Sequence, residues 1–373
     1  MAYRKIEARY VITTPMYLGG HASNVASERM REASFKGALR FWWRALMWNE
    51  AWQEAQGDES RALSLLRQWE GQLFGVAAEK GKDSRASMFR LRCFVSSNEK
   101  NAGKRDKLTG VGWRYLKGQG LDRPAAFSPG TTLKVALLLS PRLQDAQVAE
   151  LLKALVALGL FGGIGARSRR AVGSVAIEDL QLDGQQAATV PGNIDQLEET
   201  VDWLGIKRVR CPLPPIAAFS LESRLDWWSG RLEDFAFDFL DWRSYYDHTK
   251  RPPTPKSSPN FRKDHDEMLD VAKGGKTNFA PERAVFGLPH NYFFRSLRRS
   301  VGVNYKKHER HASPYLLHYH QNGSLHGVMQ TFLPNRFVEN KLMIKGRVAS
   351  EVSFQPDWQV VHNFMNHMGG ETL

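Results

Sequence analysis

The segment with the clearest chemical potential is the run Gly162-Gly163-Ile164-Gly165-Ala166-Arg167-Ser168-Arg169-Arg170, which we call the Gly/Arg loop. Its glycines can adopt positive φ and let backbone N–H groups converge on an anion. Its arginines carry forked donors that match pairs of phosphate oxygens. The alternative is a helix C-cap at Gly162 with the arginines facing water, but a C-cap requires one glycine rather than three. The sequence therefore predicts a phosphate-binding loop whose residues are Gly162, Gly163, Gly165, Arg167, Ser168, Arg169 and Arg170.

A second candidate is a helix predicted to begin at Ser34. Lys36, Arg40 and Arg44 recur at intervals of four, so they project from one side of that helix. Like charges at this spacing destabilise an isolated helix by roughly 0.2–0.5 kcal/mol per pair, and an RNA backbone along that side would reverse the effect. Ser34 and the free N–H groups of the first turn offer a further anion site. The alternative is that the three cations are solvated and that their stems cover neighbouring tryptophans.

A third basic region follows later in the chain and consists of Arg295, Arg298, Arg299, Lys306, Lys307 and Arg310, with His308 and His311 interleaved. A charge run of this kind is usually a solvated face of the protein. We nevertheless include Arg298 and Arg310 among the candidate RNA-binding residues, because they extend the basic character of the first two candidates.

Signals of catalysis are weak. The histidine pairs His308-x-x-His311 and His318-x-His320 lack cysteines or carboxylates at metal-ligand spacing, so we expect no metal site. The run 274–277 (Gly-Gly-Lys-Thr) resembles a phosphate loop of ATPases, but Asp270 stands where the leading glycine belongs. RNA cleavage by a lone histidine stays open, with His21 as the local candidate for a general base. We predict no catalytic residue and no cofactor.

The bulk composition fits a basic globular protein. The chain has 373 residues, and 52 Lys and Arg against 39 Asp and Glu give a net charge of +13 at pH 7 and a pI of about 9.7. Such a charge favours polyanions such as nucleic acid. The length predicts two domains, 1–190 and 191–373. Two cysteines and the absence of a long apolar run favour a reducing cytoplasm and exclude a membrane span.

The elements that must position these residues form a recognisable order in the first half. Alternating apolar residues predict strands over 5–13, 88–96, 132–140 and 173–182. Helical periodicity predicts helices from Ser34, over 61–73, and from a capping Asp145. The order strand, helix, strand, strand, helix, strand is that of a ferredoxin-like unit. The octapeptide of ordinary RNA-recognition motifs is absent from the sequence.

The second half is predicted to be a mixed α+β domain. Apolar residues at spacings of three and four favour one long amphipathic helix over 221–246. The Pro-rich, basic stretch 250–263 is typical of an exposed loop. Short strands are expected over 284–287, 315–320 and 327–333.

Several of these segments resemble one protein family. The Gly/Arg loop followed by Gly173-Ser174-Val175 is similar to the glycine-rich loop of the RAMP (repeat-associated mysterious protein) superfamily of CRISPR systems. The run 34–46, with Phe41-Trp42-Trp43-Arg44, resembles one branch of it, subunit one of the type III-B Cmr effector complex. The runs 70–75, 283–289 (Arg-Ala-Val-Phe-Gly-Leu-Pro) and 310–314 (Arg-His-Ala-Ser-Pro) fit the same branch. Ala171 departs from the family, which commonly has glycine there.

The resemblance implies a fold of the α+β class with two tandem ferredoxin-like domains, the second carrying a helical insertion and the basic Pro-rich loop. It implies a non-catalytic RNA-binding subunit near the 3′ end of the CRISPR RNA that helps to capture target RNA for antiviral defence. The implied partners are CRISPR RNA, target RNA and other Cmr or RAMP subunits. Two alternatives stay open. One is a metal-independent endoribonuclease that processes CRISPR RNA, and the other is a basic scaffold that binds acidic protein neighbours.

Overall fold

The structure is a computed structural model that describes residues 4–18, 30–77, 84–96, 108–118, 121 and 127–373. It contains both helices and strands in each half of the chain, and every sheet is antiparallel. The prediction of an α+β protein is therefore confirmed. Both cysteines are free. In the described part of the chain, no helix is long and apolar enough to cross a membrane.

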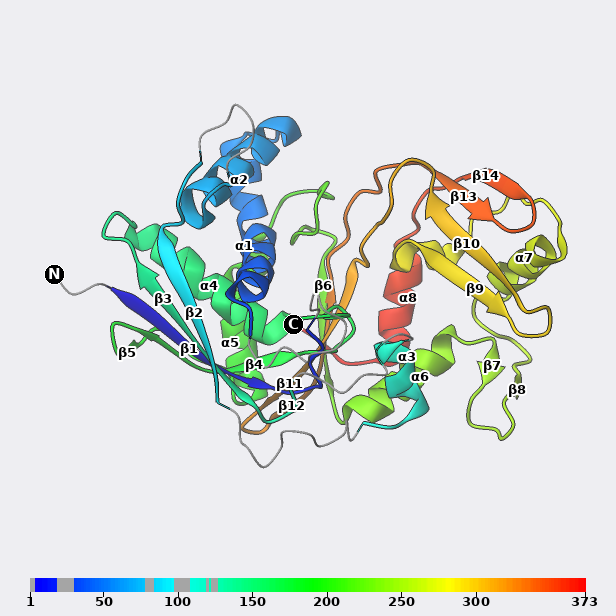
Figure 1. Cartoon of the computed structure of the whole chain (residues 1–373), viewed down its shortest axis with the longest axis horizontal. Helices are drawn as coiled ribbons and strands as arrows, with labels where there is room; N and C mark the ends of the chain where they lie inside the picture. Colours follow the sequence, from blue (N-terminus) through cyan, green and yellow to red (C-terminus); the bar gives the residue numbers. More distant parts are fainter. Residues whose placement is uncertain (1–3, 19–29, 78–83, 97–107, 119–120, 122–126) are drawn as a thin grey trace.

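The first sheet has the strand order β2-β3-β1-β4-β5 (Figure 1). Its strands are β1 (Lys5–Ile12), β2 (Phe89–Ser96), β3 (Thr132–Leu139), β4 (Val175–Leu182) and the short β5 (Gln185–Gln186). Alternation decides which face is buried, because successive side chains of a strand point to opposite faces. In β1 the buried side chains are Ile6, Ala8, Tyr10 and Ile12. The four long strands were predicted to within two residues at each end.

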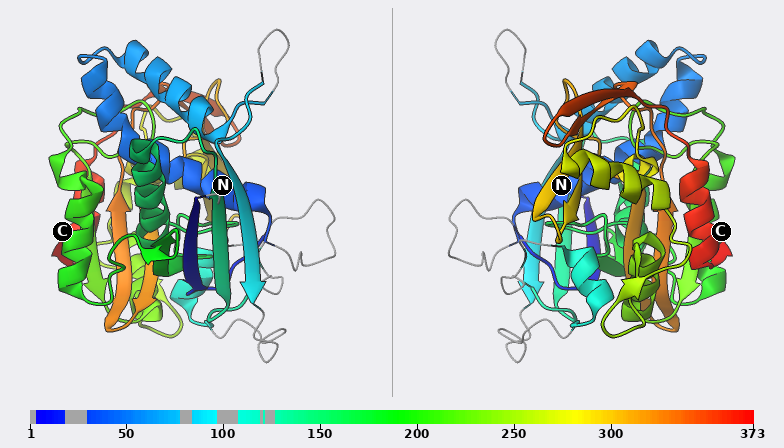
Figure 2. Two further views of the ribbon diagram at one scale, coloured as in Figure 1. Left: turned by 90° about the vertical axis from the view of Figure 1, so that its left-hand side faces the viewer. Right: turned by 90° about the vertical axis from the view of Figure 1, so that its right-hand side faces the viewer.

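Two helices cover the buried face of this sheet, and a third packs beside them (Figure 2). They are α1 (Glu32–Glu54), α4 (Asp145–Phe161) and, against α1, α2 (Glu59–Phe74). Tyr10 connects the layers, since its ring lies 5.8 Å from that of Phe35 and its hydroxyl donates to the carbonyl of Leu155. Two predicted helix starts are wrong. α1 begins two residues before Ser34, and Gln144 rather than Asp145 caps α4 through a capping box.

The second sheet has the order β11-β12-β6-β15 and is buried on both faces. Its strands are β6 (Arg224–Ser229), β11 (Tyr315–Asn322), β12 (Leu325–Phe332) and β15 (Glu371–Thr372). On β11, Leu316 packs into the core that contains the first sheet and α4. Tyr315 and Leu317 pack into a second core with α6 (Leu232–Arg243) and α8 (Gln359–Met368). Burial on both faces explains why seven of the eight residues of β12 are buried.

A third sheet, in the order β14-β13-β10-β9, lies at the other end of the molecule from the first (Figure 1). Its strands are β9 (His290–Phe294), β10 (Arg299–Tyr305), β13 (Lys341–Lys345) and β14 (Ala349–Ser353). The remaining elements are α3 (Val111–Lys117), α5 (Ile194–Leu204), η2 (Ile206–Arg208), β7 (Tyr246–Asp247), β8 (Thr254–Pro255), α7 (Arg262–Lys273) and η3 (Glu282–Phe286).

Two predictions for the second half are wrong. The long helix over 221–246 is a strand, β6, followed by α6, because Gly230 has a φ of +142° that no helix accommodates. The spacing of its tryptophans and phenylalanines fitted a helix by coincidence. The run 284–287 lies within and just after the 3₁₀ turn η3 rather than in a strand. The strands at 315–320 and 327–333 are confirmed as β11 and β12. The expected loop 250–263 is exposed over most of its length but contains β8, which pairs with β7.

Each hydrophobic core draws on residues from both sides of the predicted boundary at 190. The helix α3, from the first half of the chain, packs on α6 from the second half (Figure 1). Their approach depends on Gly112, since a Cβ at that position would lie 2.3 Å from the carbonyl carbon of Ala236. The two halves are therefore held together by backbone-to-backbone packing as well as by side chains.

We expect Gly112→Ala to lower the free energy of unfolding by about 2–3 kcal/mol, because two helices must separate to admit one methyl group. Chemical denaturation followed by circular dichroism measures this loss. The matched control is Gly110→Ala, where an added Cβ would meet no atom within 4 Å. Equal stability of the two variants would show that the contact between α3 and α6 is not tight.

Candidate nucleic-acid interface

The Gly/Arg loop lies where the two halves of the chain meet. α4 ends at Phe161, and the loop then runs alongside β11, forming an isolated parallel bridge between Arg170 and Leu317. The N–H of Ala171 donates to the carbonyl of Leu317 (2.9 Å), and the N–H of Leu317 donates to the carbonyl of Arg169 (3.0 Å). These two hydrogen bonds form a short backbone ladder between the loop in the first half of the chain and β11 in the second.

The predicted backbone nest is wrong for much of the loop. The N–H groups of Ile164, Ala166, Arg170 and Ala171 all donate to carbonyl oxygens inside the protein, so they cannot bind an anion. Gly165 does need its positive φ of +97°, and a Cβ there would lie 2.5 Å from the carbonyl oxygen of Tyr17. Its glycine serves close packing. Any phosphate contact of this segment must come mainly from side chains.

Ala171 keeps the backbone contacts that its departure from the family pattern put in doubt. It has a φ of +56°, a conformation that favours glycine, and it is fully buried. Besides the bond to Leu317, its carbonyl accepts a hydrogen bond of 2.6 Å from the hydroxyl of Thr14. The surrounding contacts hold the alanine in this conformation.

Arg169 is the arginine of the loop that faces α1. Its guanidinium carbon lies 5.0 Å from the centre of the Phe41 ring, and Nη1 donates to the carbonyl of Ser313 (2.5 Å). Burial lowers the pKa of Arg169 to about 10, so it stays charged at neutral pH. Within the described residues no carboxylate forms an ion pair with it. Arg169 is a partly buried cation whose contacts are a carbonyl and an aromatic face.

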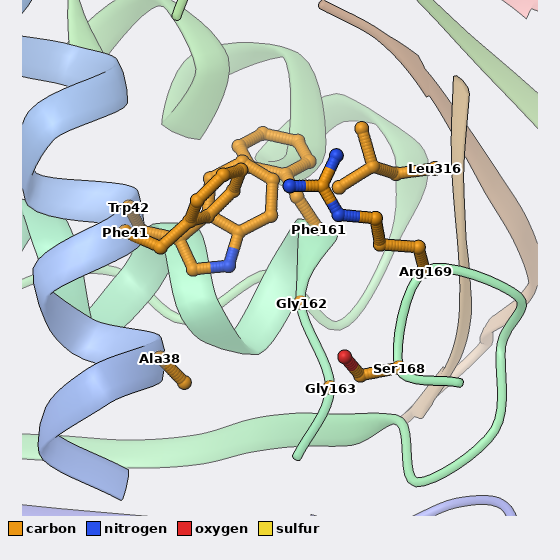
Figure 3. A pocket seen from close by; sticks show the side chains of 9 residues that line it. All are labelled: Ala38, Phe41, Trp42, Phe161, Gly162, Gly163, Ser168, Arg169 and Leu316. Carbon is orange, nitrogen blue, oxygen red and sulfur yellow. The ribbon is translucent and has the colours of Figure 1, made fainter. Parts of the chain in front are cut away.

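Two adjoining cavities open around Arg169 and Phe41, and we call them together the α1 cleft. The smaller has a volume of about 210 Å³ and is lined by Ala38, Phe41, Trp42, Phe161, Gly162, Gly163, Ser168, Arg169 and Leu316 (Figure 3). The larger, of about 390 Å³, is lined by Phe41, Arg44, Leu63, Leu66, Arg67, Glu70, Arg169, Ile216, Ala217, Ala312 and Asn335. The cleft combines aromatic surface with three guanidinium groups, on Arg44, Arg67 and Arg169.

The cations predicted on α1 lie beside this cleft, but a carboxylate partly neutralises them. Glu70 of α2 is buried, with its Oε1 at 2.7 Å from Arg40 Nε and 3.5 Å from Arg44 Nη1. Lys36 lies over the ring of Phe89, and burial lowers its pKa, as does the charge of Arg40. The like-charge repulsion expected along α1 is thus relieved within the protein.

The other predicted residues are more dispersed. Ser34 lies in the first turn of α1, and Ser168 lines the smaller cavity. Arg167 is exposed and lies against Gly118, at the C-terminus of α3. The structure does not bring Arg298 and Arg310 to the loop. Arg298 lies in the turn between β9 and β10, in the third sheet, and Arg310 is exposed in the connection from β10 to β11.

Sequence reasoning missed Phe41 and Arg67 as functional candidates, along with Asn335. Phe41 had a visible signal, since it is a large aromatic residue next to the cationic side of α1. Arg67 stands three residues before Glu70 on α2, and only the packing of α2 on α1 brings it to the cleft. Asn335 comes from a connection in the second half and had no signal.

Three of the four histidines in the predicted pairs, His311, His318 and His320, are buried in the interior of the protein. His318 Nδ1 lies 2.5 Å from the carbonyl oxygen of Gly162, and burial lowers its pKa to about 3. Burial likewise lowers the pKa of His320 to about 4. His311 stacks on Phe337 at 3.7 Å, and burial lowers its pKa to about 4. All three are neutral at physiological pH.

The remaining candidates from the sequence are the metal site, the run 274–277 and His21. Among the described residues, no group of three His, Cys, Asp or Glu side chains could hold a metal ion. The run 274–277 follows α7, with Gly274 as its C-cap, whereas a phosphate loop must precede a helix. His21 lies outside the described residues.

All five segments that carry the family resemblance meet at this place. Phe41 of α1 contacts Arg169 of the loop, and Glu70 of α2 binds Arg40. Ser313, in the run 310–314, accepts from Arg169. That run is in turn paired through His311 to Leu288 of the run 283–289. Segments that span most of the sequence therefore build a single site.

Comparisons with known proteins agree with this picture. The family model described as RAMP superfamily matches residues 9–176. No curated protein sequence matches the chain. The crystal structure of apo Cmr1 from Pyrococcus furiosus is similar with a TM-score of 0.53 and 21% identity, over 90% of each chain. A chain of the type III-B Cmr-beta complex bound to cognate target RNA and AMPPnP, in the presence of ssDNA, is similar with a TM-score of 0.52 and 12% identity, over 98% of this chain and 99% of that one. At these identities the likeness shows the fold.

We expect Glu70→Gln to lower the free energy of unfolding by about 1–2 kcal/mol, because it leaves Arg40 and Arg44 without their shared carboxylate. The arginines are partly exposed, so water offsets some of the loss. Denaturant titration measures the change. Glu54→Gln, at an exposed position of α1, is the control and should be neutral. A neutral Glu70→Gln would show that the ion pair contributes nothing to stability.

Stability should fall as the pH drops below 6.5, because the unfolded chain then binds protons that buried His318 cannot bind until about pH 3. We expect His318→Asn to make this fall shallower by up to about 1.4 kcal/mol per pH unit between pH 6 and 4. Denaturant titrations at several pH values measure the slope. His367→Asn, at an exposed position, is the control. Identical slopes for both variants would mean that His318 is not held neutral by burial.

Proposed function

Residues 9–176 of this chain match the family model of the RAMP superfamily, and from this premise we propose that the chain is a member of that superfamily and an RNA-binding subunit of a type III-B CRISPR (Cmr) effector complex. The observation that carries the proposal is the convergence of the resembling segments on the α1 cleft. We propose further that the subunit contacts the CRISPR RNA near its 3′ end, helps to capture target RNA, and assembles with other Cmr or RAMP subunits in the cytoplasm.

The fold supports this proposal in both halves. β1-α1-β2-β3-α4-β4 gives the order β2-β3-β1-β4, and β6-α6-β11-β12-α8-β15 gives the matching order β11-β12-β6-β15. We therefore propose that both halves are ferredoxin-like units. In the second half, η3 with α7, β9 and β10 is inserted before β11, while β13 and β14 are inserted after β12. The inserted strands form the third sheet.

The chemistry of the α1 cleft suits single-stranded RNA. Arg44, Arg67 and Arg169 supply donors for phosphate oxygens, and Phe41 offers a ring on which a base can stack. A net charge of +13 draws the polyanion toward the protein from a distance. Glu70, which is buried at the wall of the larger cavity, orients the guanidinium groups of Arg40 and Arg44 through its ion pairs.

We expect the double variant Arg44→Gln/Arg67→Gln to bind single-stranded RNA about tenfold more weakly, since it removes two charges from the cleft. For six phosphate contacts, the plot of log affinity against log salt should have a slope of roughly −4 for the wild type and roughly −3 for the variant. Fluorescence anisotropy from 50 to 200 mM salt measures both. Arg231→Gln/Arg262→Gln removes the same charge from exposed sites outside the cleft and is the control. Equal weakening by both double variants would mean that only net charge attracts RNA.

We propose that the subunit does not itself cleave RNA. The neutral side chains of His318 and His320 are fully buried, so they cannot reach a ribose hydroxyl. Incubation of the purified protein with labelled repeat RNA in EDTA should leave the RNA intact. Discrete products with a cyclic phosphate end would establish the alternative, a metal-independent endoribonuclease. His21→Ala would then test the candidate general base that the sequence offers.

A further inference from the structure

A second group of cations lies on the side of the Gly/Arg loop that faces α6. Its central member is Arg243, the last residue of α6, which is only 6% exposed. Its guanidinium carbon lies 4.3 Å from the ring centre of Phe286 and 5.4 Å from that of Phe239. Its buried Nε has no hydrogen-bond partner, and in the described part of the chain no carboxylate forms an ion pair with it. Arg243 is thus a buried cation without a counter-ion.

A buried carboxylate, that of Asp264, pairs with another arginine of this group, Arg283. It accepts from the backbone N–H groups of Glu282 (2.9 Å) and Arg283 (3.0 Å), from Arg283 Nε (3.4 Å) and from the hydroxyl of Tyr292 (3.0 Å). Its Oδ2 accepts three of these bonds and its Oδ1 accepts the other. Among the described residues, the ion pair of Asp264 is with Arg283.

Arg170 reaches this group from the Gly/Arg loop. The residues that follow it, Ala171 and Val172, are buried in the second core, and the charge of Arg170 acts on Arg243 and His290. The guanidinium of Arg169 lies instead over Phe41, in the α1 cleft. The strand β11 also contributes to both sides, since Leu316 lines the cleft whereas Tyr315 and Leu317 pack in the other core. The rings of Tyr315 and Phe239 are stacked with centres 6.2 Å apart, and Phe239 is also the ring beneath Arg243.

The positive charges of the three arginines lower the pKa values of groups in this region. Burial lowers the pKa of Arg243, Tyr115 opposes this, and Arg170 and Arg283 lower it further. His290, at the start of β9, has a pKa lowered by burial and then by all three arginines. Arg170 and His290 are partly exposed, so the group is not sealed from solvent.

Charge balance indicates that this arrangement is incomplete. Within the part of the chain that the structure describes, these three guanidinium groups have one carboxylate partner, Asp264, so two positive charges are unbalanced, one of them on the buried Arg243. Cation–π contacts with Phe286 and Phe239 offset only part of the cost of removing Arg243 from water. A bound anion would supply the missing charge and hydrogen-bond acceptors. Forked donors approaching from several directions suit a tetrahedral phosphate better than a planar carboxylate.

We propose that Arg170, Arg243 and Arg283 form a second anion site, across the Gly/Arg loop from the α1 cleft, which takes one phosphate group of a bound RNA strand. The site joins the loop of the first half to the run 283–289 of the second. The proposal of an anion site follows from the positions of these arginines and does not depend on the proposed function. The identity of the strand as RNA rests on the proposed function.

The test compares melting temperatures of the full chain in sodium phosphate and in sodium chloride at equal ionic strength. A tenfold excess of phosphate over its dissociation constant should raise the melting temperature by roughly 2 °C. The shift should vanish in Arg243→Met, which keeps the packing on the two rings, and in Arg170→Gln, which alters a partly exposed residue. Arg231→Gln, at an exposed residue paired with Asp234, should retain it. Because Arg243→Met could fail to fold, Arg170→Gln decides the matter in that case. A phosphate shift that is absent from the wild type, or that persists in both variants, overturns the proposal.

A competition arm identifies the source of the phosphate. A saturating single-stranded oligoribonucleotide should abolish the additional shift given by inorganic phosphate, and Arg170→Gln should weaken binding of that oligonucleotide about tenfold. A phosphate shift that survives saturating RNA overturns the assignment to an RNA strand. Failure of the proposed function is distinguishable from failure of this site. If the α1 cleft does not bind RNA, Arg44→Gln/Arg67→Gln leaves RNA affinity no lower than in its control, yet the phosphate shift and its loss in Arg243→Met remain.

Discussion

The rest of the structure depends on the short backbone ladder between residues 169–171 and Leu317. Buried N–H and C=O groups must find partners, and here the partners of a loop from the first half lie on a strand of the second. The ladder fixes the relative placement of two sheets that each bury a face against the same helix, α4. The loop turns on either side of the paired residue Arg170, and Arg169 lies over Phe41 whereas the charge of Arg170 acts on Arg243.

The arginines of this region fall into two groups, those that form an ion pair with a buried carboxylate and those that do not. Arg40 and Arg283 each have a buried carboxylate, Glu70 and Asp264 respectively, so their positions are fixed from within the protein. Arg243, which is buried, and Arg169, which is partly buried, have no carboxylate partner among the described residues and lie over aromatic rings instead. A guanidinium on an aromatic face keeps its in-plane N–H donors free for oxygen acceptors. A polyanionic ligand would therefore supply a counter-charge to the arginines that have no carboxylate partner.

The sequence predicted the first half well because its strands bury one face. Alternating apolar residues then indicate both that a segment is a strand and which of its faces is buried. It failed over 221–246, where apolar residues at spacings of three and four fit equally well to a strand, a Gly230 turn and a shorter helix. The loop and the α1 cations were found from local composition. The anionic partner Glu70 and the cleft residue Arg67 could not be, since both depend on how α2 packs against α1. Arg243 was hidden for a further reason. A cation at the C-terminus of a helix is ordinarily explained by the helix dipole, and only burial without a carboxylate distinguishes it.

The two sides of the Gly/Arg loop are not independent. Arg169 and Arg170 are consecutive, and both their positions follow from the same pairing with Leu317, so a ligand that holds one side chain also restrains the backbone of the other. Ordering of the loop by a phosphate at Arg170 reduces the conformational entropy that RNA in the α1 cleft must still remove. Binding on the two sides is then mutually reinforcing, as linkage requires of any such coupling. A single strand that contacts both sides gains this coupling within one molecule, which favours a ligand that passes over the loop rather than one that ends at it.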